Sequence, residues 1–298
     1  MYSAIAANKR NTALIMAVFI GLVGAVGWAV STMFYKGSYT ITIGVVIVAA
    51  VYAFFQYFFA AKLATAVTGA QQIEKRDNPR LYRIVENLAI ADGMPMPKVY
   101  IIDDPAPNAF ATGRDPRHAI VAATTGLLAI MDDRELEGVM AHELGHVKNY
   151  DIRVSMIAFG LVSAIALITD VARNMLLFSG LSSSDDRDSS PNPVALVVGI
   201  VIVVLAPIVA MMIQMAISRQ REYLADATGA MTTRYPEGLA SALEKLARYS
   251  QPMRNQSTAT AHLFFANPLK PGTIANLFST HPPLEDRIKR LRQNEGKF

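Results

Sequence analysis

Residues 132–146, Asp-Asp-Arg-Glu-Leu-Glu-Gly-Val-Met-Ala-His-Glu-Leu-Gly-His, decide the fold of this chain of 298 residues. Asp132 or Asp133 can cap a first helical turn, where acidic groups also suit the helix dipole. Apolar side chains then recur at helical spacing, at Leu136, Val139 and Met140. The stretch therefore predicts one helix that ends in two histidines.

The last five residues of this stretch, His142-Glu143-Leu144-Gly145-His146, predict a metal site. Histidines four residues apart project from one face of a helix, so both imidazoles can reach one ion. Glu143 lies beside that face, where it can take a proton from a water molecule on the metal. The chain has five histidines and no cysteine, so a chance match to the pattern is on the order of one in a hundred or less. Imidazole and carboxylate ligands in an open tetrahedral site favour zinc.

The third ligand has to come from elsewhere in the chain. Metzincins continue with Gly at position 149 and His at position 152, but Asn149 and Ile152 stand there, which excludes that class. Glu222 is the best candidate by spacing, because it lies in a predicted helix that follows an apolar run. Asp226 comes one turn later and can accept the second ring N–H of a ligand histidine. Two other candidates for the third ligand remain open, His262 and His281.

Composition and four apolar runs predict a membrane protein. Hydrophobic residues make up 52% of the chain and charged residues 17%, whereas charged residues usually make up about a quarter. A helical span needs about 20 apolar residues. The candidate runs are Thr12–Phe34, Ile41–Ala61, Val154–Thr169 and Pro193–Ile217. The third run is the weakest, because charged side chains interrupt residues 154–177 near their C-terminal end.

Basic residues predict the orientation of these spans. Lys9 and Arg10 precede the first span, and the connection 179–192 carries a single Arg among three Asp. Because positive charge favours the cytoplasmic side, we expect the N-terminus and both long polar regions to face the cytoplasm. The gaps from the metal motif to the nearest runs are on the order of 10 Å along a helix. The metal is therefore expected close to the membrane surface.

Four parts of the chain follow from these spans. Residues 1–62 hold two transmembrane helices, and residues 63–153 form the first part of a cytoplasmic catalytic domain. Residues 154–217 form a second hairpin with the external loop 179–192, and residues 218–298 complete the catalytic domain.

The region before the motif helix predicts a small sheet. Residues 64–92 have helical spacing, and three strands are predicted at Val99–Ile102, Asn108–Thr112 and Ala119–Ala122. The net charge of +4 is spread over two long regions without a dense basic run, so no nucleic-acid partner is expected.

Three segments resemble the HtpX-type membrane metalloproteases, which are bacterial heat-shock proteases related to the CAAX prenyl protease. The segments are Ala-His-Glu-Leu-Gly-His at 141–146, Arg-Glu-Tyr-Leu-Ala-Asp at 221–226 and Thr-His-Pro-Pro-Leu-Glu-Asp-Arg at 280–287. They occur in the right order, and the resemblance covers essentially the whole chain. It implies a mainly α integral membrane protein with a zincin-like α+β catalytic domain, a small β-sheet and up to four transmembrane helices.

The resemblance also implies the roles of the metal-site residues. His142, His146 and Glu222 would bind one zinc ion per chain, and Glu143 would be the catalytic base. Asp226 would orient a ligand histidine.

Further roles are implied around the metal. His281 and Arg287 would face the cleft as catalytic residues that stabilise an oxyanion or hold the substrate backbone. Asn108, Ala109 and Phe110 would lie on an edge strand against which an extended substrate pairs.

The implied activity is zinc-dependent hydrolysis of peptide bonds in misfolded or unassembled membrane proteins, as quality control during stress. The implied location is the bacterial cytoplasmic (inner) membrane, crossed several times, with the active site facing the cytoplasm. Expected partners are protein substrates, the lipid bilayer and other membrane quality-control proteases. Two alternatives remain open: a processing protease specific for one partner, and a non-catalytic membrane protein that binds zinc. Four protein ligands around the metal would favour the latter.

Overall fold

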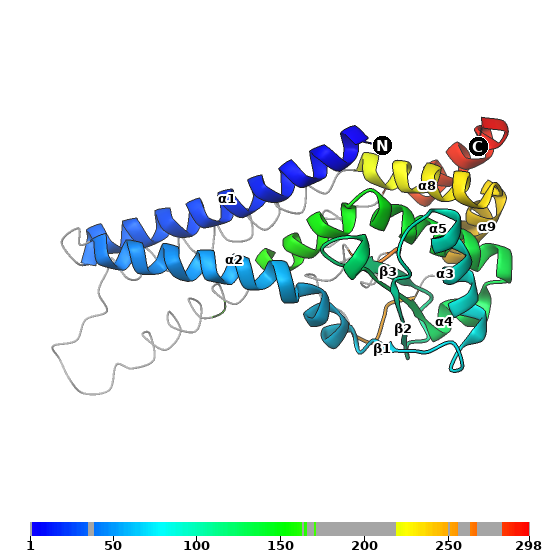
Figure 1. The fold of residues 1–298 in the computed structure, drawn as a ribbon, viewed down its shortest axis with the longest axis horizontal. Helices are drawn as coiled ribbons and strands as arrows, with labels where there is room; N and C mark the ends of the chain where they lie inside the picture. The colour runs from blue at the N-terminus through cyan, green and yellow to red at the C-terminus, as the bar shows by residue number, and fades with distance from the viewer. Residues whose placement is uncertain are drawn as a thin grey trace.

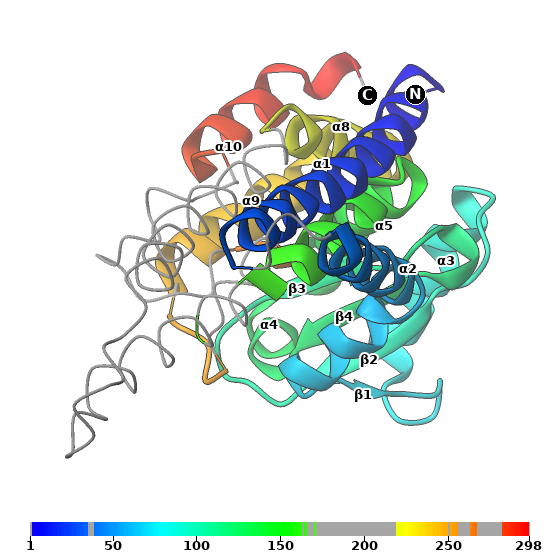
Figure 2. The same cartoon turned by 90° about the vertical axis from the view of Figure 1, so that its left-hand side faces the viewer.

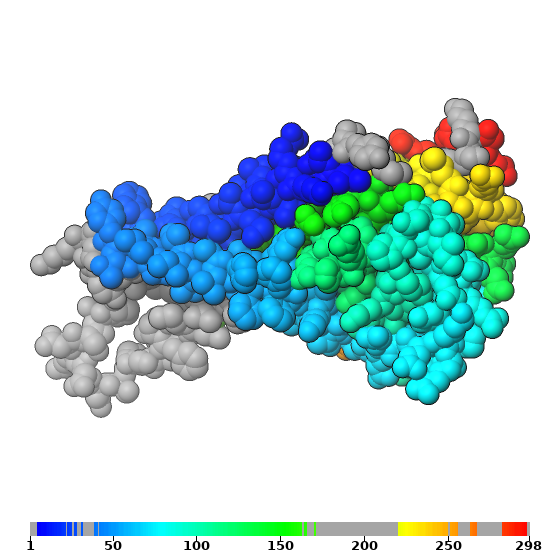
Figure 3. Space-filling model, in the orientation of Figure 1, coloured from blue at the N-terminus to red at the C-terminus, as the bar shows by residue number. Residues whose placement is uncertain are grey.

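The computed structural model describes residues 2–34, 39–162, 164–165, 170, 219–249, 251–255, 263–266 and 282–297. Two long helices extend as an arm from a rounded body that contains the sheet and the remaining labelled helices (Figures 1 and 3). The predicted loop 179–192 and the predicted span 193–217 lie outside the described residues, whereas residues 154–162 and 164–165 of the third apolar run are described.

The arm is a hairpin of α1 (Tyr2–Phe34) and α2 (Tyr39–Thr68). Within the described part of the chain, Thr42–Thr68 is the one helical segment found long and apolar enough to cross a membrane. It contains nearly all of the predicted second span. The predicted first span falls inside α1 and stays a prediction. Large apolar side chains on α2, including Val48 and Phe54, are exposed, which suits contact with lipid.

A four-stranded mixed sheet forms one side of the body. Its strands are β1 (Gln71–Gln72), β2 (Lys98–Ile102), β3 (Ala109–Thr112) and β4 (Ile120–Thr124), in the spatial order β1-β2-β4-β3. β2 and β4 are parallel, and the two outer pairs are antiparallel. The prediction of a small sheet is confirmed, and β3 lies at its edge.

The prediction of one helix over residues 64–92 is wrong. α2 ends at Thr68, β1 follows, and α3 (Pro79–Ala91) begins anew. Gly69 has a φ of 70°, the left-handed conformation that glycine supplies just beyond a helix. Asn78 then caps α3 by accepting a hydrogen bond from the Leu81 N–H, with proline in the first turn.

The predicted helix over the metal motif is present as α5 (Asp133–Lys148), and it forms the centre of the body. Asp132 caps it, and its carboxylate and that of Glu135 satisfy each other's backbone N–H groups in a capping box. Figure 2 shows α5 between the sheet and the C-terminal helices. Other described elements are η1 (Pro116–His118), α4 (Thr125–Ile130), α8 (Arg219–Thr233), α9 (Pro236–Tyr249), α10 (Leu284–Gln293) and η4 (Glu295–Lys297).

Residues 151–162 form a helix that follows α5 after a short break. It joins the body to the arm, because the Tyr52 hydroxyl on α2 donates a hydrogen bond of 2.8 Å to the Gly160 carbonyl. An added Cβ at Gly160 would meet the side chain of Gln56 on α2. The small residue therefore allows this helix to pack closely on α2.

Candidate metal centre

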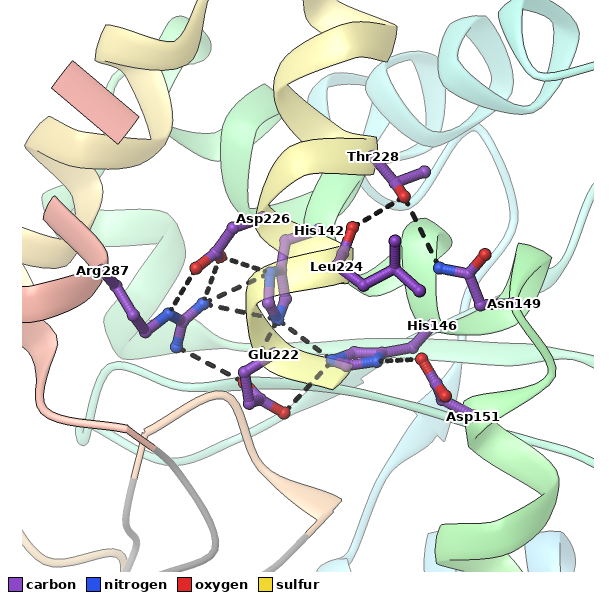
Figure 4. Close-up of polar contacts among 9 residues, drawn as sticks. All are labelled: His142, His146, Asn149, Asp151, Glu222, Leu224, Asp226, Thr228 and Arg287. Atoms are coloured by element: carbon purple, nitrogen blue, oxygen red, sulfur yellow. Dashed lines mark hydrogen bonds and ion pairs between the residues drawn. The ribbon is translucent and has the colours of Figure 1, made fainter. Parts of the chain in front are cut away.

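Two helices bring three potential metal ligands together. His142 and His146 project from α5, and their Nε2 atoms are 3.1 Å apart. Glu222, from α8, places one carboxylate oxygen 3.5 Å from His146 Nε2 and the other 3.7 Å from His142 Nε2 (Figure 4). Ligand atoms of a tetrahedral zinc ion, each about 2.0–2.1 Å from the metal, lie about 3.4 Å from one another. The three side chains therefore fit an ion of this kind.

Close packing of α8 on α5 sets these distances. Gly229 on α8 faces the backbone of α5, and an added Cβ would lie 2.9 Å from the His142 nitrogen. Gly145 on α5 faces α8 in the same way, with 3.2 Å from an added Cβ to the Ala225 oxygen. Both glycines therefore allow the helices to come close enough for Glu222 to reach the histidines.

His142 is oriented from behind by Asp226. The Nδ1 atom of His142 lies 2.8 Å from Asp226 Oδ1. This contact leaves Nε2 of His142 directed at Glu222 and His146, the arrangement that ligand histidines usually show. Asp226, one turn beyond Glu222 on α8, therefore lies where it could orient His142 for a metal, as its spacing predicts.

Arg287, from α10, lies fully buried behind the same carboxylates. Its guanidinium donates two hydrogen bonds to Asp226, of 2.9 Å and 2.7 Å, and its Nη1 lies 3.5 Å from Glu222 Oε2. A planar guanidinium matches a carboxylate in this two-bond geometry. In the structure, Arg287 therefore organises the carboxylates of the site. His281, which was predicted beside it, lies outside the described residues, as does His262.

His146 has a carboxylate partner that the sequence motifs did not indicate. Its Nδ1 atom lies 3.1 Å from Asp151 Oδ2. Asp151 follows the end of α5, beyond Tyr150, which has a φ of 61°. Two carboxylates thus hold the two histidines (Figure 4). The sequence offered one signal for Asp151: it is an acidic residue within about one turn of the end of α5.

Burial and charge separate the pKa values of the site side chains. Burial, with Glu222 as a secondary cause, raises the pKa of Glu143 to about 7. Burial and the positive charge of Arg287 lower the pKa of His142 to about 4, against the opposing effect of Asp226. Burial alone would lower the pKa of His146, but Asp151 and Glu222 outweigh it and raise the pKa to about 9. A carboxyl group with a pKa near 7 can both accept and donate a proton at neutral pH.

The predicted substrate strand already has a backbone partner from the same chain. We call residues 263–266 the edge segment. The Phe265 N–H donates a 2.8 Å hydrogen bond to the Ala109 carbonyl, and Phe110 forms an antiparallel bridge with Phe264. The Asn108 side chain donates to the Ala266 carbonyl at 2.8 Å and accepts from its N–H at 3.0 Å. The edge segment is therefore bound to β3 as an extra strand would be.

The edge segment also closes the space above the ligands. The Phe265 ring is buried and packs edge-on against His142, with ring centroids 4.9 Å apart. A cavity of about 30 Å³ remains, lined by the metal-site side chains, Ala111 and the edge segment. Such a volume holds about one or two water molecules. It is too small for a peptide.

Comparisons with known proteins identify the family. The model of "Peptidase family M48" matches residues 75–295. A "Protease HtpX homolog" of Tropheryma whipplei (strain Twist) is 55% identical over 298 residues, which cover all of both chains. Another of the same name, from Ligilactobacillus salivarius (strain UCC118), is 44% identical over 98% of this chain and 99% of its own.

A solved structure shares the fold. The crystal structure of S. mikatae Ste24p matches with a TM-score of 0.51 at 19% identity, over 96% of this chain and 66% of that chain. At this identity the likeness concerns the fold alone. The family match and the full-length relatives decide the family, and the chain therefore belongs to peptidase family M48, among its HtpX proteases.

Proposed function

We propose that this protein is a zinc endopeptidase of the bacterial cytoplasmic membrane that hydrolyses misfolded or unassembled membrane proteins. One observation carries the proposal: His142, His146 and Glu222 converge at 3.1–3.7 Å beside the buried Glu143. Three protein ligands leave the fourth tetrahedral position for water or substrate, as catalytic zinc sites do and structural sites do not. Within the described residues, no fourth His or carboxylate joins the ligand group.

The side chains divide the chemistry among them. His142, His146 and Glu222 would hold a divalent metal, which would supply Lewis-acid chemistry toward the scissile carbonyl and a water molecule. Glu143 takes the proton of the attacking water and passes it to the leaving amine, which its pKa of about 7 permits in both directions. Asp226 and Asp151 hold the two imidazoles in the tautomer that presents Nε2. His281 is assigned to the substrate oxyanion or backbone, whereas Arg287, buried against Asp226 and Glu222, holds these carboxylates in place.

The substrate is assigned to the edge of β3. An extended peptide would take the place of the edge segment along Asn108, Ala109 and Phe110, next to Glu143. Its backbone would donate an N–H to the Ala109 carbonyl and would both accept from and donate to the Asn108 side chain, as the edge segment does. Ala111 on this strand already donates its backbone N–H to Glu143. Strand pairing uses main-chain atoms, so selectivity for particular side chains is loose, which suits removal of varied damaged proteins. The edge segment must leave β3 before a substrate enters, because the present cavity is too small.

The bilayer assignment rests on the arm. The apolar hairpin of α1 and α2 leads directly into the body that carries the metal site. Since the chain has no cysteine, single cysteines can test the topology. In intact cells a membrane-impermeant thiol reagent is expected to label Ser184→Cys in the loop 179–192 and to spare Lys75→Cys until the membrane is opened. The reverse pattern would place the active site on the outer side.

The activity is tested with full-length protein in detergent and unfolded casein as substrate. Zinc-loaded protein is expected to cleave casein, and a chelator is expected to stop cleavage. Glu143→Gln should retain one zinc per chain and lose at least about a hundredfold in rate, the usual contribution of a general base. Glu137→Gln on the same helix is the matched control, since Glu137 is a surface residue paired with Arg134.

The outcomes separate the alternatives. Wild-type turnover by Glu143→Gln would contradict the mechanism. Stoichiometric zinc without casein cleavage would indicate a narrow processing protease or a non-catalytic zinc protein. The cellular role is tested by following an unassembled membrane subunit, which is expected to persist in cells that carry only Glu143→Gln.

A further inference from the structure

We propose that Asn8, in the membrane arm, is a positioning residue for the metal centre that acts on His146 through Asp151. The inference rests on the proposed metal role of His146. It makes the start of α1 a part of the site as well as the beginning of the arm.

Asp151 uses its two oxygens for two different parts of the molecule. Oδ2 lies 3.1 Å from His146 Nδ1, and Oδ1 accepts a hydrogen bond of 2.6 Å from the Asn8 amide. A carboxylate on Nδ1 keeps the proton there, so that the Nε2 lone pair is free for a metal. The position of this carboxylate therefore sets both the tautomer and the ring orientation of His146.

Asn8 also fixes the backbone that carries Asp151. The same amide group donates a second hydrogen bond, of 2.9 Å, to the Asn149 carbonyl at the end of α5. Its two N–H groups thus bridge residues 149 and 151. Both Asn8 and Asp151 are buried, where hydrogen bonds from an amide to a carboxylate are stronger than in water.

The bridged turn contains a conformation that needs support. Tyr150 has a φ of 61°, and the left-handed conformation is strained for a non-glycine residue unless its surroundings hold it. Lys9, next to Asn8, places its ammonium 4.9 Å from the centre of the Tyr150 ring. Two successive residues of α1 therefore contact the turn that delivers Asp151 to His146.

Ordinary helix packing does not predict this arrangement. Thr12, one turn further along α1, is also buried and polar, yet its hydroxyl bonds back to the Asn8 carbonyl of its own helix. Asn8 instead sends both N–H groups across to the segment after α5. The two residues therefore form a matched pair on one helix: Asn8 donates to Asp151, the partner of His146, and Thr12 donates only within its own helix.

The test measures metal binding by the full-length protein in detergent. Asn8→Leu keeps the size of the side chain and removes both donors, Asn8→Gln keeps the amide, and Thr12→Val is the control. The readouts are zinc affinity by chelator competition, the visible absorption spectrum of the cobalt-loaded protein and thermal unfolding without metal. Loss of a partner behind a ligand typically weakens metal binding about 10–100-fold. Asn8→Leu is expected to weaken zinc binding about tenfold, at the lower end of that range, and to alter the cobalt spectrum.

Asn8→Gln should recover part of the affinity, and Thr12→Val should keep all of it. The decisive comparison is between metal binding and stability. A lower unfolding temperature of Asn8→Leu with unchanged zinc affinity and cobalt spectrum would reduce Asn8 to a packing residue and overturn the inference.

Two controls keep the outcomes distinct. If Asn8→Leu does not fold, Asp151→Asn and its combination with Asn8→Gln replace it, and additive effects of the two changes on zinc affinity would overturn the inference. Wild-type protein that binds no zinc would refute the proposed function itself. Wild-type zinc binding that is insensitive to Asn8 would refute this inference alone.

Discussion

Gly229→Ala is expected to weaken metal binding without touching a ligand. The new Cβ would lie 2.9 Å from the His142 nitrogen, 3.1 Å from the Ala141 carbonyl carbon and 3.2 Å from the His142 Cα. All three are backbone atoms of α5, so no side-chain rotation can relieve the contact. An ordinary contact begins near 3.4 Å, and α8 must therefore move away by about 0.5 Å, because a packed interior has no free space to absorb the added methyl group.

The displacement acts on Glu222, which α8 carries two turns earlier. Metal–ligand distances vary by only about 0.2 Å in working sites, so a shift of about 0.5 Å takes the carboxylate outside the range for a bond to the same ion. Alanine gains about 1 kcal/mol in helix propensity, whereas overpacking costs about 1–3 kcal/mol. Folding stability is therefore expected to fall by no more than about 2 kcal/mol, while zinc affinity falls about 10–100-fold.

The assay is chelator competition for zinc, combined with thermal unfolding of the metal-free protein. Gly44→Ala on α2 is the control, because an added Cβ there meets nothing within 4 Å. Wild-type zinc affinity in folded Gly229→Ala would refute the argument that close helix packing sets the ligand geometry. An equal loss in Gly44→Ala would show that the effect is not specific to this contact.

Three further outcomes are expected. Asp132→Ala removes the cap of α5 and should lower the free energy of unfolding by about 1 kcal/mol, and an unchanged denaturation midpoint would contradict the role of the capping box. The pKa of His146 is raised to about 9, and metal binding requires the neutral ring. Zinc affinity should therefore fall as pH falls, about a hundredfold between about pH 8 and pH 6. Titrations that, after correction for protonation of the chelator, give the same zinc affinity across this range would contradict the raised pKa. Phe265→Ala removes a buried ring worth about 1.5–3 kcal/mol from the edge segment and should raise kcat/KM for a short unstructured peptide about tenfold or more, whereas a decrease in folded protein would show that the ring supports catalysis.

Local signals in the sequence accounted for much of the fold. The acidic pair before α5, the spacing of its apolar residues and the β-rich runs at β2, β3 and β4 were all visible without the structure, because caps and periodicity depend on neighbouring residues. The helix predicted over residues 64–92 failed for the same local reason. Gly69 marks the end of one helix and the Asn78-Pro79 pair the start of the next. The prediction gave more weight to the helical spacing of apolar residues than to these two signals.

The residues of the candidate metal centre were predictable where their spacing lies within a single helix. His142, Glu143 and His146 followed from spacing on α5, and Asp226 followed from its distance to Glu222 along α8. Asp151 and Asn8 did not, since their contact joins positions more than 140 residues apart through a turn in an uncommon conformation. The pairing of the edge segment with β3 was not predicted either, because strand pairing between distant parts of a chain leaves no periodic pattern in the local sequence.

The edge segment gives this protease an internal competitor. A segment tied to its own chain returns to β3 as if it were present at a millimolar concentration, and under the proposed function a substrate has to outcompete it for the bonds of Asn108 and Ala109. A soluble protein seldom reaches such a concentration. Under the proposed function, a damaged chain anchored in the same membrane would reach it, because diffusion in two dimensions would hold that chain near the site. On this proposal, competition with the edge segment would spare soluble cytoplasmic proteins, although strand pairing itself would select few side chains.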